Sequence, residues 1–291
     1  MATVLLATAA ISRLRCKKAI IEKRLKNPSP RPIHIDSTVG SWGQAKPCNG
    51  YPRQLFMKKI ISYLRNGYWK RWIRKHKCKV AGGVLSLHKR STLTIEEGVT
   101  LGHVVIESKK LEIGAHTYIR SDCVLSAVSS IGRFCSIGSS CFIGQQKSSH
   151  PLDWLSSHPF QYTDTALIYD PEVADITIGH DVWIGHSAMI LEGVSIGTGA
   201  VIATRALVAH DVPSYAIVAG TPAKVVKYRH TPELIEALIN SKWWEVDVEV
   251  LKTLPLNDPQ ATLALLATLQ KETRADYQQI EITRKGCSVS S

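Results

Sequence analysis

The side chains best suited to proton transfer lie in a stretch of about thirty residues between Ile143 and Ile176. Within it, two histidines, an aspartate and two aromatic residues fall close together: His150, Asp153, Trp154, His158 and Phe160. An imidazole, whose unperturbed pKa is about 6.5, is the side chain best matched to taking a proton from a hydroxyl group at neutral pH. Taken alone, a loop histidine is more often solvated than catalytic, so its meaning depends on the elements that hold it.

A zinc site is the alternative chemistry for these histidines. His150, His158, His180 and His186 could supply ligands, but no pair has the i, i+4 spacing of a helical site and no cysteine cluster joins them. We therefore expect no metal. The seven cysteines contain no CxxC pair and predict free thiols in a reducing compartment: Cys16, Cys48, Cys78, Cys123, Cys135, Cys141 and Cys287.

A six-residue period flanks this stretch on both sides. Before it, eight of nine positions are Ile or Leu: Ile95, Leu101, Glu107, Ile113, Ile119, Leu125, Ile131, Ile137 and Ile143. After it, the period resumes at Ile178, Ile184, Ile190, Ile196, Ile202 and Val208. The period fits a chain that turns a corner every six residues, so that three short strands make one triangular coil. Glycines beside the aliphatic residues should permit the turns, and Ile106 should replace Glu107 in the interior.

These hexads resemble those of the left-handed parallel β-helix acyltransferases, over residues 91–230. The resemblance implies a mainly β fold and an elongated prism. It also implies a homotrimer with active sites between subunits. The unperiodic stretch then becomes a surface loop inserted between two intact coils, and loops of this length in repeat proteins are usually functional.

The loop sequence HPLDWLSSHPF resembles the extended loop of xenobiotic acetyltransferases, of the chloramphenicol and streptogramin type, and of related sugar O-acetyltransferases. The resemblance implies that His150 is the general base. It implies direct attack on a thioester, without a nucleophilic Ser or Cys. It assigns four neighbours to the acceptor side: Asp153, Trp154, His158 and Phe160. Trp154 and Phe160 could instead pin the loop to the prism, and both roles could hold.

The strings DVWIG, AHDVP and AGTPAKVVKYR resemble the coenzyme A-binding end of hexapeptide acetyltransferases, which implies acetyl-CoA as co-substrate. Trp183 would then pack near the thioester, and His186, Ala203 and Ala209 would meet the pantetheine arm at coil corners. Thr221, Lys224 and Lys227 would meet the nucleotide phosphates. Relatives commonly have Thr-Lys where this chain has Ala209 and His210, and Arg205 or Arg229 could replace the missing phosphate contact. Without these motifs, Lys224 and Lys227 would read as a solvated basic strand.

The net charge of +12 is concentrated at the N-terminus. Residues 1–90 hold 21 Lys and Arg with only two acidic residues, whereas residues 91–291 are net negative. Basic helices are predicted at 1–26 and 54–79. The second interleaves aromatic and aliphatic residues with Lys and Arg, which suits an anionic membrane surface, a patch that steers acidic glycans, or simple packing on the prism. No nucleic-acid-binding motif accompanies the charge, and no export signal is expected.

The C-terminal segment predicts helices. Thr231 and Pro232 form an N-cap and first-turn pair that should begin a helix running to about Lys242. Trp243 and Trp244 resemble a structural anchor of the xenobiotic enzymes, a second helix is expected at 258–275, and the last dozen residues should fray. The chain thus divides into a basic, partly helical extension (1–90), a β-helix (91–230) with a loop at 145–175, and a helical tail (231–291).

The function expected from the sequence is acetyl-CoA-dependent O-acetylation of a sugar hydroxyl in a polysaccharide or its precursor. Acetylation of an antibiotic is the enzymic alternative, and a non-catalytic β-helix scaffold is the other. We expect a cytoplasmic homotrimer that binds no nucleic acid. A peripheral contact with the inner face of the membrane through residues 1–79 remains an open alternative.

Overall fold

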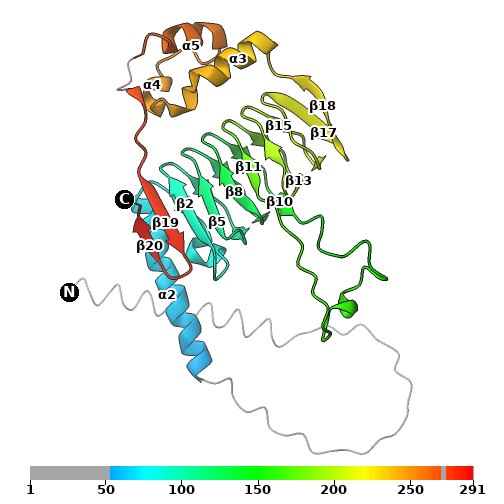
Figure 1. The fold of residues 1–291 in the computed structure, drawn as a ribbon. Coiled ribbons are helices and arrows are strands. Elements are labelled where there is room, and N and C mark those ends of the chain that lie inside the picture. The colour runs from blue at the N-terminus through cyan, green and yellow to red at the C-terminus, as the bar shows by residue number, and fades with distance from the viewer. Residues whose placement is uncertain (1–52, 270–272, 291) are drawn as a thin grey trace, which may run out of the picture. The chain divides into compact units, whose positions relative to one another are not determined.

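The computed structural model describes residues 53–269 and 273–290, and the helix expected at 1–26 lies outside this range. The chain enters through α2 (Arg53–Lys75) and a short 3-10 turn, η1 (Gly83–Ser86). It then winds into stacked coils whose short strands form three parallel sheets (Figure 1). Equivalent positions of successive coils pair 18 residues apart, as Leu101, Ile119 and Ile137 do. The predicted mainly β class and the parallel β-helix are confirmed.

Each sheet is one face of the prism. Sheet A holds β1 (Lys79–Val80), β3 (Thr100–Leu101), β6 (Tyr118–Ile119), β9 (Ser136–Ile137), β12 (Trp183–Ile184), β15 (Val201–Ile202), β17 (Ala216–Gly220) and β18 (Ala223–Tyr228). Sheet B holds β4 (Val104–Ile106), β7 (Cys123–Leu125), β10 (Phe142–Gln145), β13 (Met189–Leu191) and β16 (Leu207–Val208). Sheet C holds β2 (Thr92–Glu96), β5 (Lys110–Ile113), β8 (Val128–Ile131), β11 (Ile176–Ile178), β14 (Ser195–Ile196), β19 (Gln279–Thr283) and β20 (Cys287–Val289).

The hexad aliphatics form the interior, as predicted. Ile95, Leu101, Leu125 and Ile143 are 0% exposed, and Ile106 is equally buried, so it does replace Glu107. Small residues fill the space near the corners. The thiols of Cys123, Cys135 and Cys141 are free and buried, and each donates to a backbone carbonyl of the next coil at 3.1 Å.

At the coil corners, most residues with positive φ are not the glycines that the sequence analysis expected to permit the turns. At Gly114 an added Cβ would lie 2.6 Å from the backbone nitrogen of Arg133 in the next coil, so glycine is needed there for close stacking. The left-handed conformation falls instead on non-glycine residues two positions later, such as His116 (φ 58°) and Phe134 (φ 60°). Gly144 (φ 97°) is a position where glycine does supply the positive φ.

The C-terminal segment runs back along the stacked coils from the β18 end toward β2, and then joins sheet C (Figure 1). It contains α3 (Pro232–Ser241), η3 (Trp243–Glu245), α4 (Val248–Leu251) and α5 (Pro259–Leu266). Thr231 caps α3 through its hydroxyl, as predicted. The expectation that the last dozen residues fray is wrong for the described residues to 290. β19 pairs antiparallel with β2 and β20, and Ile280 and Ile282 are buried in the core.

Candidate active site

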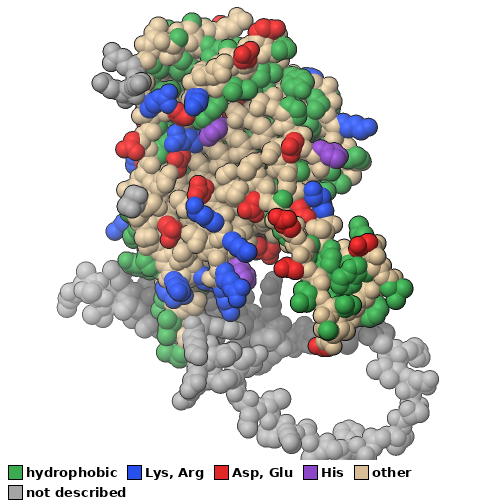
Figure 2. All heavy atoms as spheres, in the orientation of Figure 1, with side chains coloured by type: hydrophobic (Ala, Val, Ile, Leu, Met, Phe, Trp, Pro, Cys, Tyr) green, Lys and Arg blue, Asp and Glu red, His purple; other side chains and the backbone are tan. Residues whose placement is uncertain are grey.

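The predicted loop leaves the prism at the corner between sheets B and C. It runs from the end of β10 to the start of β11 and contains one 3-10 turn, η2 (Pro159–Gln161). Figure 1 shows it extending away from the stacked coils. Five of its apolar side chains are more than half exposed in the single chain: Leu152, Leu155, Phe160, Leu167 and Ile168. Figure 2 shows hydrophobic side chains gathered on the protruding loop.

His150 is exposed on this loop, and its orientation is fixed by one hydrogen bond. Its Nδ1 lies 2.8 Å from the backbone carbonyl oxygen of Ser157. Because a carbonyl oxygen can only accept, Nδ1 carries the proton in the neutral ring, and Nε2 keeps a free lone pair. The side chain is therefore held in the tautomer that a general base requires.

Aromatic packing gives the loop its shape. The ring of Trp154 lies 6.0 Å from Tyr162 and 5.7 Å from Tyr169, and these two tyrosines stack at 5.6 Å. The hydroxyl of Tyr169 donates to the carbonyl of Ser148 at 2.8 Å, two residues before His150. Trp154 therefore packs inside the loop itself, and its two ring contacts are not with the prism to which the sequence analysis considered it pinned.

The other predicted loop residues are only partly engaged. His158 caps η2, because its Nδ1 accepts from the backbone N–H of Phe160 at 3.1 Å. Phe160 is 56% exposed and packs against the ring of His158, with centroids 5.8 Å apart. Asp153 is exposed. Neither Phe160 nor Asp153 pins the loop.

Sequence reasoning missed Glu192, which follows β13 and whose side chain holds the first residues of the loop. Its side chain is 2% exposed. Oε1 accepts from the backbone N–H of Lys147 at 2.9 Å and from the hydroxyl of Ser148 at 3.0 Å. Oε2 is buried and has no hydrogen-bond partner among the described residues. No sequence pattern distinguishes Glu192, because other acidic residues such as Glu107 and Glu112 also occur among the hexads.

The predicted donor residues gather on sheet A and at its corner with sheet B. Trp183 is 58% exposed. It begins an outward row in which paired positions continue through Val201 and Ile217 to Lys227. Thr221 lies in the turn between β17 and β18, and Lys224 lies on β18. The aromatic and basic residues assigned to coenzyme A therefore share one face.

His186 lies at the corner between sheets A and B, in a chain of serine hydroxyls. Its Nδ1 lies 3.0 Å from the hydroxyl of Ser139 and its Nε2 lies 2.9 Å from that of Ser187. One coil further on, Arg205 adopts φ 60° and its backbone N–H donates to the carbonyl of His186. Ala203 shares this corner. Ala209, which follows β16, lies at the corner between sheets B and C instead.

A single protomer does not unite the two halves of the site. The loop leaves at the corner between sheets B and C, whereas Trp183 lies on sheet A and His186 lies at the corner between sheets A and B. Among the described residues, no hydrogen bond joins the loop to either of them. Within the described ranges, no three His, Cys, Asp or Glu side chains gather as a ligand set.

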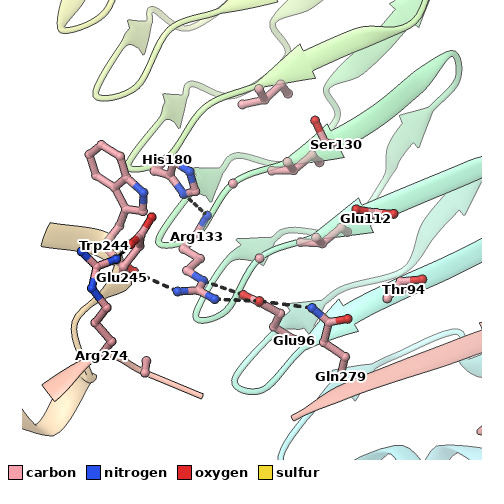
Figure 3. A pocket seen from close by; sticks show the side chains of 16 residues that line it. Thr94, Glu96, Glu112, Ser130, Arg133, His180, Trp244, Glu245, Arg274 and Gln279 are labelled. Atoms are coloured by element: carbon pink, nitrogen blue, oxygen red, sulfur yellow. Dashed lines mark hydrogen bonds and ion pairs between the residues drawn. The ribbon is translucent and has the colours of Figure 1, made fainter. Parts of the chain in front are cut away.

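A hollow of about 540 Å³ lies elsewhere, on sheet C beside Trp244 (Figure 3). There Arg133 makes two hydrogen bonds to Glu96, at 2.7 and 2.8 Å. The ring of His180 stacks on Trp244 at 4.6 Å, and its Nδ1 accepts from the backbone N–H of Arg133. Burial, and then the positive charge of Arg133, lower the pKa of His180 to about 4. These groups satisfy one another and attach the C-terminal segment to the prism.

Comparison with known proteins adds the following. The bacterial transferase hexapeptide (six repeats) family matches residues 175–210. A chloramphenicol acetyltransferase of Klebsiella aerogenes is 46% identical over 129 residues, which cover 42% of this chain and 61% of that protein. Another, of Agrobacterium fabrum, is 37% identical over 154 residues, covering 50% and 72%. The chain spans 61 to 64% of the length of the first three curated relatives it matches.

Among solved structures, a hexapeptide-repeat acetyltransferase of Vibrio cholerae complexed with acetyl coenzyme A shares 29% identity. The match covers 46% of this chain and 72% of that chain, with a TM-score of 0.37.

Proposed function

The chain belongs to the hexapeptide-repeat acetyltransferases that include chloramphenicol acetyltransferase, and on that premise we propose that it transfers acetyl from acetyl-CoA to a hydroxyl group. The observation that carries this proposal is His150. Its ring is exposed on the inserted loop, and the carbonyl of Ser157 holds it with Nε2 free to accept a proton. An exposed, oriented imidazole beside a repeat domain of this family fits a general base.

The reaction needs only one proton carrier. Nε2 of His150 takes the hydroxyl proton as the acceptor oxygen attacks the thioester carbonyl. The tetrahedral intermediate then collapses, the carbon–sulfur bond breaks, and the imidazolium returns the proton to the departing thiolate of CoA. Neither a Ser nor a Cys nucleophile takes part, because both substrates are bound together. This agrees with the buried positions of Cys123, Cys135 and Cys141, whose thiols point into the coil interior.

Acetyl-CoA is assigned to sheet A and its corner with sheet B. Trp183 offers an exposed indole face for the thioester end of the pantetheine arm, and Lys227 lies at the far end of the same row, where an ammonium group can meet a phosphate. The remaining proposed donor contacts are His186, Ala203, Arg205, Ala209, Thr221 and Lys224.

For the acceptor we propose a sugar hydroxyl of a glycan or of its membrane-tethered precursor. The loop carries five carboxylates against one lysine, Lys147, which favours a neutral sugar over a strongly acidic one near His150. Asp153 and His158 are exposed polar groups able to hydrogen-bond sugar hydroxyls, and Phe160 offers an exposed ring for a sugar face. Trp154, whose ring packs against Tyr162 and Tyr169, is the fourth proposed acceptor residue.

A second acceptor is favoured by the names of the relatives, several of which are chloramphenicol acetyltransferases. The exposed apolar side chains of the loop, such as Leu152 and Leu155, would suit an aryl-bearing antibiotic as well as they suit contact with another subunit.

The proposed enzyme is a homotrimer, which supplies from two protomers the groups that one protomer keeps apart. The second proposed association is contact with the inner face of a membrane through residues 1–79, and the proposed location is the cytoplasm. Within the described ranges, no helix combines the length and hydrophobicity needed to cross a bilayer.

The decisive experiment is release of free CoA thiol from acetyl-CoA across a panel of sugars, glycans and chloramphenicol. We expect His150→Ala to reduce turnover about a hundredfold or more with the best acceptor. His88→Ala, which replaces another exposed histidine away from the loop, is the matched control and should leave turnover unchanged. Wild-type turnover in the folded His150→Ala protein would refute the proposal. The best acceptor in the panel decides between a glycan and an antibiotic.

A further inference from the structure

Helix α2 has two opposite faces, only one of which is used by the fold. Asn66 is 8% exposed and its amide donates to the carbonyl of Gly82 at 3.0 Å. Ile73 is 0% exposed, and Trp69 and Trp72 pack against the core cluster. These contacts anchor the C-terminal half of the helix to the first coil.

The opposite face carries an apolar stripe that no described residue covers. Its members recur at helical spacing: Met57 (55% exposed), Ile60 (38%), Ile61 (58%), Leu64 (66%) and Tyr68 (59%). At 100° per residue these positions lie on one side of the helix, away from Asn66 and Ile73. From Met57 to Tyr68 the stripe is about 16 Å long. In Figure 1 this part of α2 extends beyond the stacked coils.

Basic residues flank the stripe without acidic partners. The sequence of α2 contains eight Lys and Arg and no Asp or Glu. Arg65, Arg71, Arg74 and Lys75 are exposed, and none of them forms a salt bridge with a described residue. A positive helix with an exposed apolar face complements a surface that is anionic and also has an apolar layer beneath its charges.

We propose that the stripe of α2 (Met57, Ile60, Ile61, Leu64 and Tyr68) docks on an anionic lipid surface. The aliphatic side chains enter the boundary between headgroups and acyl chains, and the flanking guanidinium and ammonium groups meet lipid phosphates. Nucleic acid would use the charges but would leave the aliphatic side chains in water. Lipid binding would bring the enzyme to a membrane-tethered acceptor. Only this purpose rests on the proposed function; the lipid binding itself does not.

Binding is measured by co-sedimentation of the full-length protein with vesicles of phosphatidylcholine, with and without phosphatidylglycerol. We expect binding only with phosphatidylglycerol and weakening with added salt. Replacing both stripe residues, Ile61→Ser with Leu64→Ser, should reduce the partition coefficient about tenfold or more. Leu256→Ser is the matched control, since Leu256 is an exposed leucine (55%) outside α2, and it should bind as the wild type does.

Four results would overturn the proposal: no binding by the wild type, equal loss in the control, full binding by the stripe variant, or loss that appears only when residues 1–52 are deleted. Duplex DNA binding with the same dependence on Ile61 and Leu64 would also overturn it. Turnover on a soluble acceptor is measured in parallel and should be unchanged in the stripe variant. Loss of vesicle binding with intact turnover separates this inference from the proposed acetyl transfer, which fails only if turnover itself is absent.

Discussion

At the scale of single residues, the state of His150 depends on a backbone carbonyl seven positions later in the same loop. The hydrogen bond from Nδ1 to the carbonyl of Ser157 fixes the ring only if residues 150 and 157 are themselves held in place. The loop is held in turn by its aromatic cluster and by the root that Glu192 forms with Lys147 and Ser148. The position of the His150 ring therefore depends on the buried carboxylate of Glu192, which lies outside the loop.

Glu192→Ala tests this transmission. The substitution removes the acceptor for the Lys147 N–H and the Ser148 hydroxyl, so the root of the loop loosens and His150 is held less well. We expect kcat to fall about tenfold with KM for acetyl-CoA unchanged, because Glu192 makes no hydrogen bond to any proposed donor residue. Glu192→Gln keeps one acceptor oxygen and should restore most of the activity. Equal kcat values for Glu192→Ala and wild type, or equal damage by both substitutions, would contradict a positioning role.

At the scale of elements, the coils could be predicted from the sequence because each hexad repeats one physical requirement. An aliphatic residue such as Ile119 or Ile137 must fill the same interior position in every coil, and the repeat reports it directly. The hairpin of β19 and β20 could not be predicted, because its two buried residues, Ile280 and Ile282, form too short an alternation to stand out in a segment expected to fray.

Some residues of the candidate site could be predicted from the sequence and others could not. His150 and Trp183 could be found because their surrounding strings resemble known motifs. Glu192 could not, because its role arises from the contact between a corner and the root of the loop, which no local sequence pattern records. The free face of α2 could not be predicted either, because the sequence does not indicate which face of the helix packs against the prism.

The junction between the C-terminal segment and the prism should be sensitive to acid. His180 stacks on Trp244, and burial lowers its pKa to about 4. Because the folded-state pKa lies below the unfolded value of about 6.5, the unfolded state gains a proton first as pH falls. His180 therefore contributes stability that is present above pH 6.5 and is lost as pH falls toward 4.

Urea unfolding at pH 7 and pH 5 measures this effect. We expect the wild type to lose about 1 to 2 kcal/mol more than His180→Asn between the two values, after allowance for partial exposure of the ring. Burial also lowers the pKa of His116, but His116 is present in both proteins and cancels in the difference. The same loss in both proteins would show that His180 is not the titrating group.

At the scale of the whole molecule, the three faces of the prism carry different outward rows. Sheet C presents a polar row in register: Glu281, Thr94, Glu112, Ser130, Thr177 and Ser195. Sheet B presents an apolar row: Val105, Val124, Phe142, Met189 and Leu207. Sheet A presents the proposed donor row. An apolar row running the length of one face favours sheet B as the face buried between subunits.

Threefold packing on sheet B also has a consequence for the site. If sheet B of each protomer faces the axis, the two corners that bound it meet the corners of its neighbours. The corner between sheets B and C, which bears the His150 loop and Ala209, then lies beside the neighbouring corner that bears His186 and Ala203. The two halves of the site that one protomer keeps apart would be completed across each interface.

Phe142→Asp tests this arrangement at the centre of the apolar row. Phe142 is half-buried in the single chain and points outward from β10, so a carboxylate there should leave the coil intact but be strongly disfavoured in a dry interface. We expect the light-scattering mass to fall from trimer to monomer and acetyl transfer to be lost. Thr177→Asp makes the same chemical change on the polar row of sheet C and should remain trimeric and active. A trimeric Phe142→Asp protein, or a monomer that keeps full turnover, would exclude sheet B as the interface that completes the site.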